Sequence, residues 1–169
     1  YPHMTGLGGD SFWLVRSPDG DLFAIDACGA AGENVDLDLY ANAGLDAIPF
    51  RGPLAAITSA GTVSGWAHVL SETVGKLPLD VLLDAAINYA EDGVKVTASG
   101  AAAATAKDAE LAGNVGYSSV FRPNGQPLKA GDTLKQPALA QTLKRLAQNG
   151  LQDFYTGTIA ADLVDDLTK

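Results

Sequence analysis

The stretch GLGGDSFWLVRSPDGDLFAID, positions 6–26, carries the clearest signal for the fold. Two short apolar runs, residues 11–16 and 22–26, flank the connector SPDGD. A five-residue connector with Pro and Gly between two β-type runs predicts an antiparallel hairpin. The first run contains FWLV, which is apolar without alternation, and this favours a strand covered on both faces. The stretch therefore predicts one β-hairpin inside a core.

The residues before this hairpin indicate a loop that enters a strand. Positions 1–10 contain a glycine cluster, and they show neither an apolar signal-type core nor a capped first helix. We therefore expect a further segment before Tyr1, which the 169 residues do not include.

Beyond position 60 the apolar residues recur at helical spacing. Helices are predicted at residues 62–74, 79–91, 98–111, 137–147, 152–155 and 158–167. A short helix is predicted at 35–40, a short strand at 55–58, and a loop at 113–132, where Pro and Gly are frequent. The fold class is thus α+β, one core hairpin followed by a mostly helical region. A two-stranded sheet is marginal by itself, so its neighbours are expected from another segment or chain.

Composition excludes several classes of protein. The formal net charge is −9, and no basic stripe with interleaved aromatic residues is present, so nucleic acid is not an expected partner. No apolar run approaches the ~18 residues of a membrane span. The single cysteine excludes an internal disulfide. The compartment remains open.

The polar motifs have ordinary structural interpretations. The glycine cluster at 6–10 precedes a strand instead of a helix, which favours a tight turn over a dinucleotide site. His3, His68 and Cys28 lack the spacing of metal ligands, so neither a metal nor a cofactor is expected. In SAGTVSG, positions 59–65, Thr62 or Ser64 is expected to cap the following helix. Cys28, among small residues, is interpreted as a small packing residue or as a pocket wall.

Four segments together resemble the γ-glutamyltransferase (γ-glutamyltranspeptidase) family. The glycine-rich loop and first strand match GLGGDSFWLV, and the return strand with its following loop matches SPDGDLFAIDACGAAG. The family's Gly-Thr-Val helix, Gly-x-Leu-Pro turn and next helix resemble residues 59–97. Its Gly-Asp-x-Leu-x-Gln-Pro run and Phe-Tyr-x-Gly helix resemble residues 125–167. The resemblance covers essentially all of the chain.

The resemblance implies a fold and partners. Family members are proenzymes that cleave themselves autocatalytically into a large and a small subunit. Their fold is the N-terminal-nucleophile (Ntn) hydrolase αββα sandwich. Residues 1–169 are expected to form a single partial domain, an early segment of the large subunit. The preceding helix, the rest of the large subunit and the small subunit are expected outside this segment.

The resemblance also implies the chemistry, which is amide hydrolysis or acyl transfer with glutathione-type substrates. The family's nucleophile is a Thr at the N-terminus of the small subunit, and its own α-amine acts as base. No Thr in these residues stands in a Thr-Thr-His type of motif. No catalytic residue is therefore expected in this chain, which should be inactive by itself.

The expected substrate-binding residues are Asp26, Cys28 and Gly29. Transferases of the family carry an Arg after the return strand, where it holds the glutamyl α-carboxylate, and here that place falls on Cys28 or its neighbour. This variant is similar to family members that hydrolyse small amides such as oxamate. Two other readings stay open: a non-catalytic helical interaction domain, and a small-ligand binder that uses the two glycine-rich turns.

Overall fold

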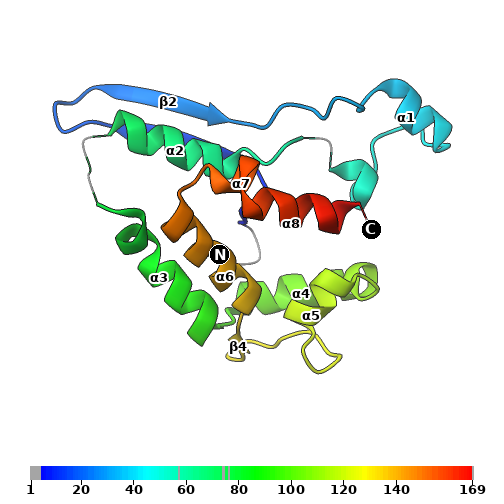
Figure 1. Ribbon diagram of the computed structural model, residues 1–169. Helices are drawn as coiled ribbons and strands as arrows, with labels where there is room; N and C mark the ends of the chain where they lie inside the picture. The colour runs from blue at the N-terminus through cyan, green and yellow to red at the C-terminus, as the bar shows by residue number, and fades with distance from the viewer. Residues whose placement is uncertain (1–4, 57, 74, 76, 169) are drawn as a thin grey trace. The chain divides into compact units, whose positions relative to one another are not determined.

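The predicted hairpin is present in the computed structural model of the protein, which describes residues 5–56, 58–73, 75 and 77–168 (Figure 1). Strands β1 (Ser11–Arg16) and β2 (Leu22–Ala27) pair antiparallel, with Trp13 opposite Ile25. In the turn, the Ser17 amide donates to the Asp21 carbonyl at 2.8 Å. Gly20 has a φ of 98°, which favours glycine there. The hairpin prediction is confirmed, and β2 is one residue longer than predicted.

The two faces of the hairpin differ in exposure, although the sequence of β1 does not alternate. Side chains that point to one face, including Trp13, Val15 and Ile25, are buried or half-buried. On the other face Phe12 is 71 % exposed and Leu14 is 74 % exposed. Within the described residues only one face is covered, so the prediction of a strand covered on both faces is not met in this chain.

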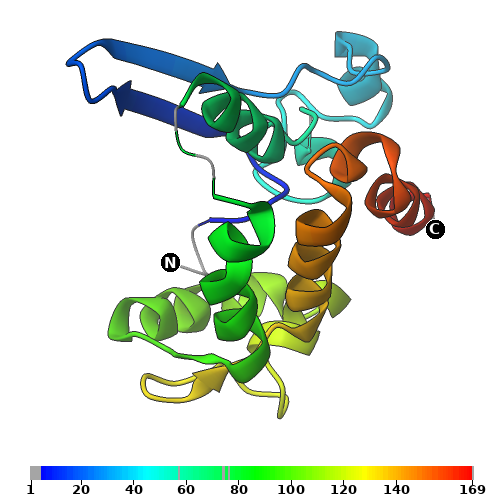
Figure 2. The ribbon, with the colours of Figure 1, turned by 60° about the vertical axis from the view of Figure 1, so that its left-hand side comes forward.

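Helix α2 (Thr62–Glu72) covers the inner face of the hairpin (Figures 1 and 2). Gly65 allows the close approach, because a Cβ there would lie 2.6 Å from the Ser11 Oγ and 2.8 Å from the Ala27 Cβ. Val63, on the same helix, is fully buried. The predicted helix at 62–74 is confirmed up to Glu72, and Val74 lies outside the described residues.

The segment between β2 and α2 differs from the predictions in detail. Helix α1 (Leu37–Asn42) begins two residues later than expected, because the Asp36 carboxylate accepts the Leu39 amide and caps it. The 3-10 helix η1 spans Pro53–Ala55. The predicted strand at 55–58 is wrong: Thr58 forms an isolated bridge with Ala31, and Ile57 lies outside the described residues.

The described chain forms two compact units, Thr5–Gly75 and residues 77–168. That they belong to a single partial domain stays a prediction. The second unit contains α3 (Leu79–Asp92), β3 (Val94–Lys95), α4 (Ala98–Leu111), α5 (Val115–Phe121), β4 (Thr133–Leu134), α6 (Pro137–Asn149), α7 (Asp153–Thr156) and α8 (Thr158–Leu167).

Helices α3 and α6 pack against each other and form the core of the second unit. Leu146 and Ala140 of α6 are fully buried, and Leu83 of α3 is 8 % exposed. At the edge of this contact the Lys144 Nζ lies 2.6 Å from the Glu91 Oε1. The helices predicted at 79–91, 98–111, 137–147, 152–155 and 158–167 are confirmed to within two residues at their ends. None of the described helices is long and apolar enough to cross a membrane.

One helix in this unit was predicted as loop. Helix α5 begins after Asn114, whose side-chain oxygen accepts the Tyr117 amide at 2.9 Å. Tyr117 and Phe121 stack one turn apart, with ring centroids separated by 5.3 Å. Pro123, Gly125, Pro127 and Gly131 follow Phe121, so they end this helix without preventing it, and α5 tolerates Gly116 in its first turn.

Asp153 caps helix α8 from outside it. Its carboxylate accepts the Thr158 amide at 3.0 Å and the Ile159 amide at 3.4 Å. Burial raises the pKa of this carboxyl, but these hydrogen bonds, with one from the Thr158 hydroxyl, outweigh burial and lower the pKa below its ordinary value. Because the folded pKa is depressed, the stability from this charge is present above the unfolded pKa and is lost as the pH falls through the folded one.

We expect Asp153→Asn to lower the thermal stability of the protein by an amount that depends on pH. The difference from wild type should be largest above about pH 5 and should shrink below about pH 4, because the unfolded carboxyl titrates at about 3.9. Thermal unfolding of the variant and of wild type, followed from below about pH 4 to above about pH 5, measures this difference in stability. Asp19→Asn, in the exposed hairpin turn, is the control. A difference that does not change with pH would show that the charge at Asp153 has no stabilising role.

Candidate functional site

The loop that follows β2 packs directly on the loop that precedes α2. A Cβ on Gly29 would lie 1.5 Å from the Ser59 carbonyl oxygen, and a Cβ on Gly61 would lie 2.0 Å from the Ala27 carbonyl oxygen. Backbone therefore touches backbone at both places, which only glycine permits. Positions 26–29, the last two residues of β2 and the two that follow it, are held against the start of α2 in this way. Because the sequence analysis predicts that Asp26, Cys28 and Gly29 bind substrate, this segment is hereafter called the substrate loop.

Hydrogen bonds join the glycine-rich loop, the substrate loop and the start of α2. The Gly29 amide donates to the Asp10 Oδ1 at 2.9 Å, across 19 positions of sequence. The Cys28 amide donates to the Asp26 Oδ1 at 3.0 Å. Both the amide and the hydroxyl of Thr62 donate to the Gly9 carbonyl, at 2.9 and 2.7 Å. The three segments are thus joined by one network of backbone and side-chain hydrogen bonds.

The predicted capping of α2 is wrong. Gly61 is the N-cap residue, and no side chain caps the helix. The Thr62 hydroxyl donates to the Gly9 carbonyl instead, and the Ser64 hydroxyl donates to the Gly61 carbonyl at 2.7 Å. Since the Thr62 amide is also bonded to Gly9, these contacts give the start of α2 a structural role.

Cys28 is exposed, so it is not the small packing residue that the sequence analysis allowed. The tightly packed residue of this loop is Gly29. The hydrogen bond between its side chain and Asp26 is the largest cause of a raised thiol pKa, and the negative charges of Asp26 and Asp10 add to it. A protonated thiol is a weak nucleophile, so this environment does not activate Cys28. It also offers no positive charge to an anionic substrate group.

The structure places the predicted residues Asp26, Cys28 and Gly29 at the end of β2 and the start of the loop that follows it, with Asp26 and Cys28 exposed and Gly29 half-buried. It adds Asp10, which the sequence analysis did not select. The only signal for Asp10 was its place at the end of the glycine cluster, directly before the strand that pairs with β2. His68 is exposed on α2, and His3 lies outside the described residues. In the part of the chain that the structure describes, no group of three or more His, Cys, Asp or Glu side chains is arranged to hold a metal ion.

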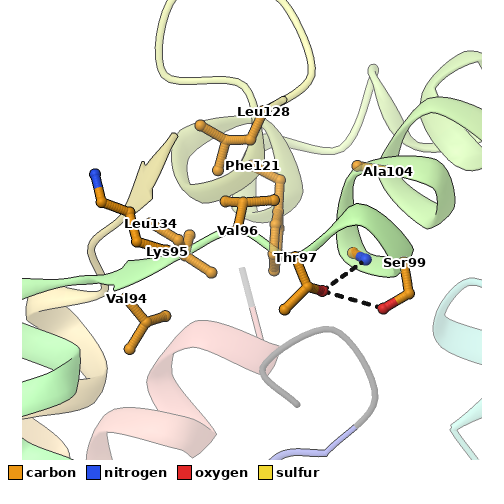
Figure 3. A pocket seen from close by; sticks show the side chains of 10 residues that line it. Val94, Lys95, Val96, Thr97, Ser99, Ala104, Phe121, Leu128 and Leu134 are labelled. Atoms are coloured by element: carbon orange, nitrogen blue, oxygen red, sulfur yellow. Dashed lines mark hydrogen bonds between the residues drawn. The ribbon is translucent and has the colours of Figure 1, made fainter. Parts of the chain in front are cut away.

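The second unit contains a separate cavity of about 210 Å³ (Figure 3). It is lined by Val94, Lys95, Val96, Thr97, Ser99, Gly100, Ala104, Phe121, Leu128 and Leu134. Lys95 donates to the Thr133 hydroxyl at 3.0 Å, and the Thr97 hydroxyl accepts the Gly100 amide at 3.1 Å. The lining has no carboxylate, imidazole or thiol, and it contains none of the predicted substrate-binding residues.

Comparison with known proteins agrees with the motif resemblance. The chain is 49 % identical to the oxamate amidohydrolase proenzyme of Klebsiella pneumoniae over 171 residues, with 99 % of this chain and 32 % of that protein covered. It is 38 % identical to the glutathione hydrolase-like YwrD proenzyme of Bacillus subtilis, with 99 % of this chain and 31 % of that protein covered. The chain thus spans about a third of the length of these curated relatives.

A solved structure shows the same fold. The γ-glutamyltranspeptidase of Pseudomonas nitroreducens, complexed with L-DON, superimposes with a TM-score of 0.85 at 29 % identity. The match covers 99 % of this chain and 49 % of that one. The α+β class and the assignment to a fragment of this fold are confirmed. The family model described as gamma-glutamyltranspeptidase matches residues 1–169, and the chain therefore belongs to the gamma-glutamyltranspeptidase family.

Proposed function

We propose that this chain is an early segment of the large subunit of an N-terminal-nucleophile amidohydrolase or acyltransferase. The match to the family over residues 1–169 supports this, as does the description of both curated relatives as proenzymes. The whole protein is then a self-cleaving precursor. Its partners would be the rest of the large subunit and a small subunit that carries the nucleophilic Thr.

In this proposal the reacting groups lie outside residues 1–169. The Thr hydroxyl of the small subunit attacks the amide carbonyl while its own α-amine takes the proton. Backbone amides stabilise the oxyanion that forms. The part played by this chain is to present Asp26, Cys28 and Gly29 to the substrate.

We propose a small amide such as oxamate as the substrate. The observation that carries this choice is Cys28, an exposed thiol whose pKa Asp26 and Asp10 raise, at the loop where the family's transferases place an Arg. An Arg–carboxylate pair is strong and directional, and a neutral thiol cannot replace it. The 49 % identity to an oxamate amidohydrolase proenzyme points the same way.

The second candidate is γ-glutamyl transfer or glutathione hydrolysis. The likeness to the glutathione hydrolase-like proenzyme and to the γ-glutamyltranspeptidase structure supports it. Family membership favours either enzyme over the interaction domain and the small-ligand binder that the sequence left open.

The test uses the full-length protein. Intact mass should show two chains that meet at a new N-terminal Thr, and the purified protein should release ammonia from oxamate with a higher kcat/KM than it shows for a γ-glutamyl anilide. The reverse order of kcat/KM would favour the second candidate. A protein that stays uncleaved and turns over neither substrate would contradict the proposal.

Residues 1–169 alone should release no product from oxamate or from γ-glutamyl anilides, because an activated nucleophile is missing from them. The measurement compares this segment with the full-length protein at equal concentration. As a control, the mature full-length enzyme added in trace amount must be detectable in the same assay. Turnover by the segment alone, free of full-length enzyme, would overturn the assignment of the nucleophile to another subunit.

A further inference from the structure

Asp10 lies where the glycine-rich loop becomes β1, directly before Ser11. Ser11 pairs with Ala27 in the hairpin register, so the residue before Ser11 faces the residues that follow β2. From there the Asp10 Oδ1 accepts the Gly29 amide at 2.9 Å. This hydrogen bond connects the start of β1 to the loop that follows β2.

The substrate loop itself contributes little to its own anchoring. Cys28 is exposed, Gly29 has no side chain, and the Cys28 amide donates within the loop, to the Asp26 carboxylate. The Ser59 amide and hydroxyl both donate to the Ala30 carbonyl, which fixes the position after the loop. Asp10 thus supplies, from another segment, a side-chain hydrogen bond to the loop itself.

We propose that Asp10 is a positioning residue, which holds the substrate loop through its hydrogen bond to the Gly29 amide. The inference rests on the proposed function, in which this loop contacts the substrate. Asp10 acts as an acceptor of one hydrogen bond and not as a group that touches the substrate. Its loss should loosen Cys28 and Gly29 and weaken substrate binding without removing a reacting group.

The experiment compares Asp10→Ala, Asp10→Asn and the control Asp19→Ala in the full-length protein, with oxamate as substrate. Asparagine keeps a side-chain oxygen that accepts the Gly29 amide, whereas alanine keeps none. Asp10→Ala should raise KM about tenfold while kcat changes less than about threefold, as expected for one lost hydrogen bond to a charged acceptor. Asp10→Asn should restore most of this loss. Asp19, in the exposed hairpin turn, should have no effect.

Hydrogen exchange of a peptide that spans residues 23–31 provides a readout independent of activity. Exchange at this peptide should accelerate in Asp10→Ala and stay close to wild type in Asp10→Asn and Asp19→Ala. If Asp10→Ala does not mature, Asp10→Ser, whose hydroxyl is too short to reach Gly29, takes its place in both measurements.

Two results would overturn the proposal. Equal damage by Asp10→Asn and Asp10→Ala would show that the charge matters and the hydrogen bond does not. Unchanged KM and unchanged exchange in Asp10→Ala would show that Asp10 does not hold the loop. If the wild-type protein turns over neither oxamate nor a γ-glutamyl anilide, the proposed function fails by itself, and hydrogen exchange still decides whether Asp10 holds the loop.

Discussion

Replacing Gly29 by alanine should destabilise the protein by about 3 kcal/mol and abolish most of its activity, because the loop has no room for a Cβ. That atom would lie 1.5 Å from the Ser59 carbonyl oxygen and 2.4 Å from the Ser59 carbonyl carbon. Both contacts are with backbone, which cannot turn away as a flexible side chain can. The substrate loop must then separate from the start of α2, and Cys28 moves with it.

Urea denaturation of the full-length protein measures the loss of stability, and kcat/KM for oxamate measures the loss of activity. Gly8→Ala is the matched control, since Gly8 lies in the same unit and nothing is within 4 Å of a Cβ placed there. It should behave like wild type. A Gly29→Ala protein with unchanged stability and activity would mean that the two loops do not pack backbone to backbone.

Replacing Cys28 by arginine should shift substrate preference towards γ-glutamyl compounds. The change adds a guanidinium group at the loop where the family's transferases hold a carboxylate, and Cys28 is exposed, so the larger side chain can be accommodated. A charge-assisted bidentate contact is worth roughly 1.5–3 kcal/mol, or about ten- to a hundredfold in preference. Asp26 and Asp10, which now flank the thiol, would offset the cost of the new positive charge.

The measurement is the ratio of kcat/KM for a γ-glutamyl anilide to that for oxamate, in a variant shown to cleave itself. Cys28→Met is the control for size without charge and should leave the ratio near wild type. Cys28→Lys should give a smaller shift than arginine, because an ammonium cannot make the bidentate contact. A ratio that arginine leaves unchanged would mean that this loop does not contact the substrate.

Local patterns in the sequence were enough to predict most of the elements. The hairpin follows from its SPDGD connector, and α3, α6 and α8 follow from apolar residues at helical spacing. Errors arose where a side chain or a tertiary contact decided the outcome. Asn114 caps α5 inside a segment predicted as loop, and Thr58 forms one bridge with Ala31 where a strand was predicted.

That Asp26, Cys28 and Gly29 bind substrate stays a prediction, and the sequence did not indicate which segments contact them. Asp26, Cys28 and Gly29 are consecutive or nearly so, and a family resemblance selects them without knowledge of the fold. Asp10 and Ser59 are 19 and 30 positions from Gly29, and no local pattern indicates that they contact it. The register of the hairpin and the packing of two glycine-containing loops bring them there.

The sequence by itself determined the hairpin, the main helices and the family, because these depend on local spacing and on motifs that can be read in order. The tertiary structure alone decided that Thr62 bonds to Gly9 and does not cap its helix, that Cys28 is exposed, and that Asp10 bonds to the substrate loop. The physical reason is that hydrogen-bond partners and pKa shifts depend on which atoms lie within a few ångströms. For Thr62 and Asp10 these neighbours come from segments distant in the sequence.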